Sequence, residues 1–338
     1  MQQQHPPLTE HPPRPTGAGE KLLYEILANS LDTPKVSVII PTTRRPALIG
    51  RAVASVLAQT MADLELIVVV EGPNPETSAI LAAIADPRLR VLQNDSPTGA
   101  GAARNLGAAH ARGDWLAFLD DDDEFLPEKL ETQLALAAGR NVLVSCRSRV
   151  VTPHATYVWP RTLYDGRQPI DEYLFDRKTL FRGDTLLQTS SYLLPRPLFE
   201  RTRFGDSRQN EDTTLLLRVT KQAGAAILVA PETLVVLHTE EARESLGSLY
   251  QWRDMLAWAD SVRDLFTPRA YSGFCLIYLG SQAARHRQWR GLPILLVRAL
   301  RHGSPTPAQL AAFLAFWIIP IGLRRRLRAA ALRPAPAA

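Results

Sequence analysis

The chain of 338 residues is 46% hydrophobic and 22% charged, which excludes wholesale disorder because there is enough apolar material for a packed core. Two cysteines are too few for a disulfide framework or a cysteine-rich zinc site, so a reducing compartment is the simpler interpretation. The formal charge of +5 is unevenly divided: residues 265–338 hold eleven arginines and no acidic residue, which leaves −6 for residues 1–264.

Residues 1–34 are predicted to be a flexible lead. The first 20 of them are rich in Gln, His and Pro and cannot bury apolar surface. They contain no basic patch followed by an apolar run, so we expect no secretory signal and a cytoplasmic location for the body of the protein.

From residue 35 onward, apolar runs alternate with helical patterns. Strands are expected at 36–40, 64–70, 90–92 and 115–119, and helices are expected between them. Because the runs do not alternate in polarity, they predict a parallel sheet covered by helices on both faces. Ligands of such sheets bind beyond the carboxyl ends of the strands, so the residues that follow each run are the candidates for a site.

Five consecutive acidic residues, 120–124, follow the fourth expected strand. A charge run is ordinarily a solvated turn, but this one comes directly after a core strand, where a parallel sheet has its ligand crevice. The pattern predicts a site for Mg²⁺ or Mn²⁺, hard cations that bind carboxylates together with substrate phosphates. A metal held in this way usually serves a diphosphate ligand.

A glycine-rich stretch at 99–103 opens like a dinucleotide-binding fingerprint. Its third glycine position is occupied by Arg104, and the stretch follows the third expected strand instead of opening the fold. We therefore expect no NAD site here.

Seven short pieces, in order and with matching spacing, resemble the nucleotide-binding half of family 2 glycosyltransferases. They are VSVIIPT (36–42), SVLAQT (55–60), ELIVVVEG (65–72), ARNLG (103–107), ARGDW (111–115), FLDDDD (118–123) and LPEKLE (126–131). The resemblance implies an α/β GT-A fold, with a Rossmann-like, mainly parallel central sheet and helices on both faces. It assigns the glycosyltransferase domain to 35–240, with nucleotide-sugar binding in 35–133 and the acceptor side and base in 134–240.

For the donor nucleotide, the resemblance implies roles for residues at two of the expected strand ends and for Arg104. Pro41 and Thr42 would line the nucleotide pocket, and Arg104 would face the diphosphate. Glu71 stands where the family usually has an aspartate that contacts the base and ribose. The neighbouring positions of that motif do not match, so the base is open and a UDP-sugar is only the default donor.

For the metal, the resemblance points to Asp120 and Asp122, which bracket the family's DxD signature, and Asp122 is the expected direct ligand. Asp120 and Asp121 are also expected to contact the nucleotide-sugar. His238 follows an apolar run at a place where related enzymes often carry a histidine near the diphosphate. A lone histidine after a strand is more often structural, so both interpretations of His238 stay open.

For the acceptor side, residues 210–218 match the family's Glu-Asp motif at a helix start, with Asn210 as the expected N-cap. Asp212 is the predicted general base, and Glu211 is placed beside the acceptor. Acids in a first turn can also simply favour the helix dipole. Thr189 and Ser190 belong to a stretch that resembles the family's strand bordering the acceptor site.

Together these assignments predict an inverting, metal-dependent glycosyltransferase. The cation and Arg104 would stabilise charge on the departing diphosphate, and Asp212 would take the proton of the acceptor hydroxyl in one displacement. The expected acceptor is a glycan or a lipid-linked glycan of bacterial cell-surface polysaccharide synthesis. Two alternatives stay open: a nucleotidyltransferase, whose usual glycine-rich loop is missing after the first strand, and a non-catalytic sugar-nucleotide-binding scaffold.

Residues 241–338 are predicted to be a helical region with a basic tail. Within it, 310–323 lacks charge and precedes four arginines, which is compatible with a core helix, a spanning helix or an interfacial helix. A span needs roughly 20 apolar residues, and arginines gain about 1 kcal/mol each near anionic lipid. We therefore favour peripheral attachment to the inner face of the cell membrane. The absence of lysine beside an apolar run argues against nucleic acid as the partner.

Overall fold

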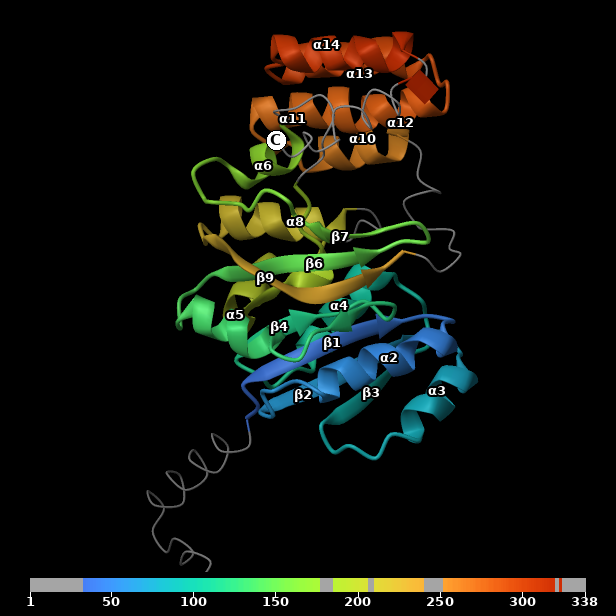
Figure 1. Ribbon diagram of the computed structural model, residues 1–338, viewed down its shortest axis with the longest axis vertical. Coiled ribbons are helices and arrows are strands. Elements are labelled where there is room, and N and C mark those ends of the chain that lie inside the picture. Colours follow the sequence, from blue (N-terminus) through green and yellow to red (C-terminus); the bar gives the residue numbers. More distant parts are fainter. Residues whose placement is uncertain (1–32, 177–184, 206–209, 240–251, 320–321, 324–338) are drawn as a thin grey trace, which may run out of the picture.

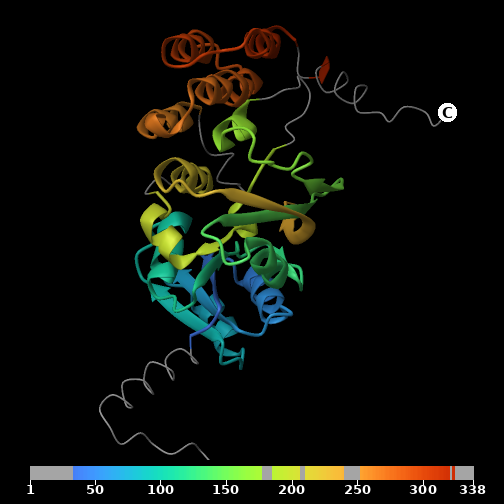
Figure 2. The ribbon, with the colours of Figure 1, turned by 90° about the vertical axis from the view of Figure 1, so that its left-hand side faces the viewer.

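The structure is a computed structural model, and it describes residues 33–176, 185–205, 210–239, 252–319 and 322–323. A central β-sheet carries helices on both faces, and further layers of helices are stacked beyond one of those faces (Figures 1 and 2). The predicted N-terminal lead, apart from its last two residues, and the arginine-rich tail after residue 323 lie outside the described residues.

Nine strands form the sheet within the described part of the chain. They are β1 (Val36–Thr42), β2 (Leu64–Glu71), β3 (Leu89–Asn94), β4 (Trp115–Phe118), β5 (Glu124–Phe125), β6 (Leu143–Val151), β7 (Thr156–Trp159), β8 (Leu193–Pro195) and β9 (Ile227–His238). Their spatial order is β3-β2-β1-β4-β8-β6-β9-β5, and β7 pairs with β6. The four strands expected from the sequence are β1 to β4, and they pair in parallel as predicted.

The second half of the sheet departs from the parallel pattern. Strand β8 is antiparallel to β4 and β6. Strand β5 is antiparallel to β9, and β7 is antiparallel to β6, whereas β6 and β9 are parallel to each other. The sheet is therefore mixed: it is parallel in its first half and partly antiparallel beyond β4. Strands as short as β5 and β8 carry no periodicity that a sequence pattern could reveal.

Apolar, mostly β-branched residues build the first two strands, and every residue of β1 and β2 is buried. Such runs suit a pleated strand that is covered on both faces. Successive side chains point to opposite faces, so Ile39 joins one hydrophobic core while Val38 and Ile40 join the other. The sheet thus separates two cores, and each core needs its own layer of helices.

The helices supply these layers. They are α2 (Pro46–Leu57), α3 (Pro75–Ala82), α4 (Ala100–Ala109), α5 (Lys129–Ala137), α6 (Ile170–Phe175), α7 (Arg196–Thr202), α8 (Glu211–Leu217), α10 (Trp252–Ser261), α11 (Pro268–Gly273), α12 (Gly280–Arg285), α13 (Gly291–His302) and α14 (Pro307–Ile318). Helices α2, α3 and α5 cover the face that carries Val38, and α4, α7 and α8 cover the face that carries Ile39.

Helix α4 packs very closely on β1. A Cβ atom on Gly107 would lie 2.5 Å from Cγ2 of Ile39 and 3.2 Å from Cγ2 of Val69, so the approach requires a residue without a side chain. The glycine-rich stretch that opens α4 is therefore part of a helix that is fitted tightly to the sheet.

Helices α10 to α14, with the π-helical turn η4 (Phe274–Leu279), form the layers beyond α8 (Figure 1). Trp258 of α10, Phe274 of η4 and Phe313 of α14 belong to the same hydrophobic core as Leu215 of α8. The indole N–H of Trp258 donates to Oγ1 of Thr214 in α8 at 3.0 Å. The core of the helical region is thus continuous with the core of the sheet region.

The uncharged segment at 310–323 is mainly the C-terminal part of α14. Phe313 is buried in the core, whereas Leu314 and Ile318 are exposed. Within the described residues, no helix combines the length and the apolar character that a membrane crossing requires.

Candidate active site

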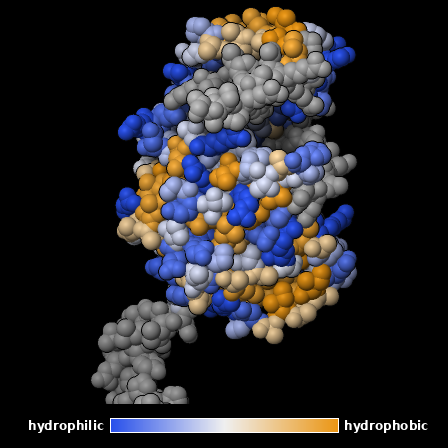
Figure 3. All heavy atoms as spheres, viewed as in Figure 1, coloured by the Kyte–Doolittle hydropathy of each residue, from blue (hydrophilic) through white to orange (hydrophobic). Residues whose placement is uncertain are grey.

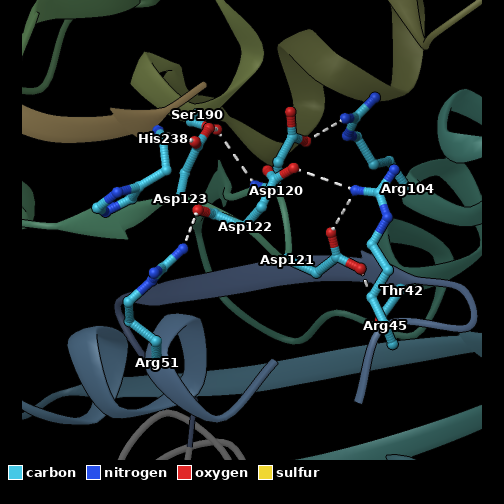
Figure 4. Close-up of polar contacts among 10 residues, drawn as sticks. All are labelled: Thr42, Arg45, Arg51, Arg104, Asp120, Asp121, Asp122, Asp123, Ser190 and His238. Carbon is cyan, nitrogen blue, oxygen red and sulfur yellow. Dashed lines mark hydrogen bonds and ion pairs between the residues drawn. The ribbon is translucent and has the colours of Figure 1, made fainter. Parts of the chain in front are cut away.

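The acidic run forms the turn after β4, at the carboxyl edge of the parallel strands (Figure 4). Thr42, the last residue of the neighbouring β1, donates from Oγ1 to Oδ2 of Asp121 at 2.8 Å. Asp120, Asp122 and Asp123 each offer a carboxylate oxygen, and these oxygens lie within 4.8 Å of one another. The cluster contains the two aspartates expected to bind metal, and it adds Asp123, which was not among the predicted ligands.

Two arginines face the acidic run: Arg45, directly before α2, and Arg51, within α2. Nη1 of Arg45 donates to Oδ1 of Asp121 at 3.0 Å and to Oδ2 of Asp122 at 3.1 Å. Nη2 of Arg51 donates to the main-chain carbonyl of Asp122 at 2.7 Å. Burial alone would lower the pKa of Arg45, but the carboxylates of Asp121 and Asp122 raise it instead. Sequence reasoning missed both arginines, and their only signal was a position soon after the first strand.

Asp123 is buried, and several hydrogen bonds hold its carboxylate. Oγ of Ser190 donates to Oδ2 at 2.7 Å, and the N–H of His238 donates to Oδ1 at 3.2 Å. Burial raises the pKa of Asp123 well above its usual range, and the nearby charges of Asp120 and Asp122 raise it further. Burial likewise raises the pKa of Asp121. Carboxyl groups crowded in this way gain from a bound cation, which favours their ionised forms.

Thr189 and Ser190 lie in a short turn, η1 (Thr189–Ser191), and both are buried. The stretch that resembled one strand is thus a turn followed by β8. Oγ of Ser190 accepts from the N–H of Asp120 at 3.2 Å and donates to Asp123, so this residue holds the acidic turn at two points. A role for either residue in acceptor binding stays a prediction.

The ring of His238 pairs with Glu124, with 2.6 Å between Nε2 and Oε1. Within the described residues, the close group of possible ligands consists of Asp120, Asp122 and Asp123 and does not include His238. His238 ends β9, whose pairing with β5 brings its ring to Glu124 at the end of the acidic run. This pair gives His238 a structural contact, and a role near the diphosphate stays a prediction.

Glu71 ends β2 and is buried, and it holds the segment that leads into α4. Its Oε1 accepts from the N–H of Thr98 at 2.7 Å, from the N–H of Gly99 at 3.1 Å and from the hydroxyl of Thr98 at 3.0 Å. Pro41 is buried within β1, one residue before Thr42. Both lie at the carboxyl edge of the sheet as expected, and their contacts with a nucleotide stay predictions.

Arg104 connects the acidic turn with Glu211, the residue before the predicted base. Its buried guanidinium forms ion pairs with Asp120 and with Glu211, the latter at 3.2 Å between Nη1 and Oε1. The guanidinium also lies over the ring of Phe204, with Cζ 5.2 Å from the ring centroid. Burial alone would lower the pKa of Arg104, but the two carboxylates raise it well above its usual value.

Asp212 is half-buried in the first turn of α8, next to Glu211. Burial raises its pKa to about 7, the charge of Glu211 adds to the rise, and the N–H of Thr213 and the charge of Arg104 oppose it. The expected N-cap, Asn210, holds that position, but its backbone is left-handed (φ 51°) and its side chain makes no capping hydrogen bond. The predicted N-cap position is thus confirmed, but the side-chain capping bond that usually accompanies it is not made.

Residues 37–201 match the family model of glycosyl transferase family 2, a stretch that contains the sheet edge and the whole acidic turn. This stretch of the chain is a glycosyl transferase family 2 domain. The family predicted from the short sequence pieces is thereby confirmed, and so is glycosyltransferase activity. The nucleotidyltransferase and scaffold alternatives are set aside.

Two relatives illustrate the match of this glycosyltransferase with known sequences. The chain is 28% identical over 325 residues to the succinoglycan biosynthesis protein ExoO of Rhizobium meliloti, which covers 89% of each chain. It is 34% identical over 112 residues to the UDP-Glc:alpha-D-GlcNAc-diphosphoundecaprenol beta-1,3-glucosyltransferase WfgD of Escherichia coli. The second match covers 33% of this chain and 44% of that protein.

Solved structures agree on the fold. S. aureus TarS 1-349 in complex with UDP-GlcNAc has a TM-score of 0.51 and 18% identity, over 67% of this chain and 66% of that chain. The Pyrobaculum calidifontis mannosyltransferase PcManGT, in complex with GDP-Man and Mn²⁺, has a TM-score of 0.50 and 19% identity, over 93% of this chain and 84% of that chain. These similarities confirm the predicted GT-A fold.

Proposed function

We propose that this glycosyltransferase transfers a sugar from a nucleotide-diphosphate sugar to a hydroxyl group of its acceptor, with inversion at the anomeric carbon. One observation carries the proposal: Arg104 bridges Asp120 of the acidic turn and Glu211, the neighbour of Asp212. The acidic turn, which we assign to the donor, therefore lies at one end of these two ion pairs. Asp212, whose pKa is about 7, lies next to the other end.

The acid cluster fits a divalent cation. Asp120, Asp122 and Asp123 supply oxygen atoms, which are the ligands that Mg²⁺ and Mn²⁺ prefer. Arg45 pairs with Asp121 and Asp122, and Arg104 pairs with Asp120. Burial and the neighbouring carboxylates still raise the pKa of Asp123, and a bound cation would favour its ionised form. When bound here, the cation would neutralise charge on the leaving diphosphate.

The remaining steps belong to residues of this chain. Asp212, once ionised, accepts the proton of the acceptor hydroxyl while the hydroxyl oxygen forms the new bond to the anomeric carbon. The bond from that carbon to the diphosphate oxygen breaks, and Arg104 contributes positive charge on the side where the diphosphate leaves. A single displacement with one base gives inversion, whereas hydrolysis by a glycosidase needs two flanking carboxylates.

The names of the relatives guide the choice of donor and acceptor. The E. coli relative is named for transfer from UDP-Glc to a sugar on diphosphoundecaprenol, and the Rhizobium relative for succinoglycan biosynthesis. We therefore propose a UDP-sugar as the first donor to test, a GDP-sugar as the second, and a glycan or lipid-linked glycan of a cell-surface polysaccharide as the acceptor. A lipid-linked acceptor would place the enzyme at the cytoplasmic face of the cell membrane, as a peripheral protein.

Two variants test the proposal. A thermal-shift screen of nucleotide-diphosphate sugars with Mn²⁺ or Mg²⁺ first identifies the donor. Asp122→Ala should then lose metal-dependent donor binding, because a cation ligand is removed, whereas Asp212→Asn should bind donor and metal as the unmodified enzyme does. Release of the nucleoside diphosphate in the presence of acceptor should fall at least a hundredfold in Asp212→Asn, because the base is missing.

The two variants fail in different ways if the assignment is wrong. Donor affinity in Asp122→Ala that is unchanged with and without Mn²⁺ would remove the metal role. Substantial turnover in Asp212→Asn would remove Asp212 as the base. Asp165→Ala, at an exposed acid far along the chain from both motifs, serves as the control and should retain donor binding and turnover.

A further inference from the structure

Helix α14 has an inverted distribution of polarity. Its exposed residues are all apolar: Pro307, Ala308, Ala311, Leu314 and Ile318. All but Ala308 follow one another at spacings of four, three and four, which places them on one side of the helix. Its single polar side chain, Gln309, is buried on the opposite side. A helix that faced only water would show the reverse arrangement.

Helix α13 repeats the pattern with arginines at both ends. Arg290, Ile294, Val297 and Arg301 have the same four-three-four spacing, and all four are exposed. The buried residues of α13, among them Leu295, lie on the other side of the helix. The outward side of α13 is thus an apolar strip between two positive charges.

The two strips belong to one surface. Helices α13 and α14 both pack on α12 and η4, and they form the outermost layer of the molecule, at the end farthest from β3 (Figures 1 and 2). Figure 3 shows hydrophobic side chains gathered over this layer at the top of the molecule. We call the exposed side chains of this layer, Ile294, Val297, Leu300, Leu314 and Ile318 with Arg290 and Arg301, the outer face.

The outer face is fixed rigidly to the catalytic part of the enzyme. Gln309 donates from Nε2 to Oδ1 of Asp176 at 3.0 Å, and it also completes a capping box with Thr306. Phe313 packs so closely on η4 and α12 that a Cβ on Gly280 would lie 2.6 Å from its ring. A surface bound to the outer face would therefore hold the whole enzyme in one orientation.

We infer that the outer face lies flat on an anionic lipid bilayer, with α13 and α14 in the plane of the interface. Charge decides between the possible occupants. No acidic residue follows Asp264 while eleven arginines do, so a second copy of this face would bring like charges together, whereas anionic headgroups complement them. The apolar strips would enter the acyl boundary and the flanking arginines would contact headgroups. The inference rests on the proposed function only in that a lipid-linked acceptor would be held in that bilayer.

Vesicle binding by the full-length protein, without donor or acceptor, tests the inference. Val297→Glu and Ile318→Glu should each lower partition onto phosphatidylcholine vesicles containing phosphatidylglycerol about tenfold. In each variant a charge would replace an apolar side chain that the bound membrane buries. Val91→Glu is the matched control, since Val91 is also exposed, at 44% against 56% for Val297, but lies on β3 at the far end of the molecule. Arg290→Gln should weaken binding about fivefold on these vesicles and much less on pure phosphatidylcholine.

Other results would overturn the assignment. If Val297→Glu and Ile318→Glu partition as Val91→Glu does, the membrane is bound elsewhere or not at all. If sedimentation velocity shows a dimer that these two variants dissociate, and vesicles do not bind, a second copy covers the outer face. Donor binding, measured on the same variants, should be unchanged, so failure of the membrane inference can be told apart from failure of the proposed reaction.

Discussion

Asp212 combines a position and an environment that suit a general base. It stands one residue from Glu211, whose carboxylate is paired with Arg104, and burial together with the charge of Glu211 brings its pKa to about 7. A base with a pKa close to the working pH is ionised often enough to act and still accepts a proton readily. Glu211 cannot replace it while held in the ion pair, which is why the two neighbouring acids have different roles in the proposal.

The pH dependence follows from this pKa. Because the base must be ionised, kcat/KM should rise with pH, reach half of its plateau near pH 7 and fall tenfold for each pH unit well below that. Steady-state rates at subsaturating donor and acceptor from pH 5.5 to 9 measure the profile. A profile already flat at pH 5.5 would show an ordinary carboxylate at this position and contradict the prediction.

The same shift has a consequence for stability. The pKa of Asp212 is higher in the folded chain than in the unfolded one, so the stability it contributes is full below about pH 4 and is lost as pH rises through about 7. Asp212→Asn removes this pH-dependent loss and should melt at a higher temperature than the unmodified enzyme at pH 8 but not at pH 4. The comparison is a control on the catalytic result, because loss of turnover in a stabilised variant cannot come from unfolding.

At the scale of elements, the contact between α4 and β1 places Arg104. Gly107 lets the helix approach Ile39 of β1, and Asn105 exchanges two hydrogen bonds with the backbone of Phe204, at 3.0 and 3.1 Å. These contacts fix α4 against the sheet on one side and against the segment before α8 on the other. The position of Arg104 between the acidic turn and α8 therefore depends on Gly107 and Asn105, through their contacts with Ile39 and Phe204.

Gly107→Ala should destabilise the fold by about 1–3 kcal/mol, because a methyl group would be forced to within 2.5 Å of Ile39 in a packed core. Gly50→Ala, inside α2, is the matched control: nothing lies within 4 Å of its Cβ position, so the change should stabilise by about 0.5–1 kcal/mol. Urea unfolding monitored by circular dichroism measures both. Equal effects of the two substitutions would mean that α4 does not approach β1 as described.

At the scale of the whole molecule, a buried carboxylate links the sheet region with the outer helices. Asp171 of α6 is fully buried, accepts from the N–H of Thr267 before α11 at 2.6 Å and pairs with Lys221 at 3.3 Å. Together with the shared hydrophobic core around Phe274, the hydrogen bond from Thr267 to Asp171 joins the outer helices firmly to the sheet region that carries the candidate active site. The outer face can thus set the orientation of the active site.

Asp171→Ala should lower the free energy of unfolding by about 2–3 kcal/mol, because it leaves the partly buried N–H of Thr267 and the amine of Lys221 without this partner. Asp165→Ala is the comparison, since its pair with Arg167 is exposed, and should change stability by less than about 0.5 kcal/mol. Urea unfolding should show one transition in both variants. Two separate transitions in the unmodified chain would contradict a continuous core.

Much of the fold was predictable because its signals are local. The runs that became β1 and β2 are buried on both faces, so their residues are apolar without alternation, and the parallel pairing followed. The acidic run could be placed at the carboxyl edge of the sheet because a strand end in such a sheet has a known position, and its metal role stays a prediction. Strand β8 and the turn η1 were not predictable as such, because short segments owe their conformation to the strands beside them.

By itself, the sequence determined the family, the parallel half of the sheet, the acidic turn and the candidate base, since each depends on residue types at fixed short spacings. Only the tertiary structure decided which groups meet. The pairing of β5 with β9 brings His238 to Glu124, and α4 carries Arg104 between Asp120 and Glu211. The tertiary structure also decided which side of α13 and α14 is buried. Both sides of these helices are largely apolar, so the sequence pattern does not show which side packs on the core.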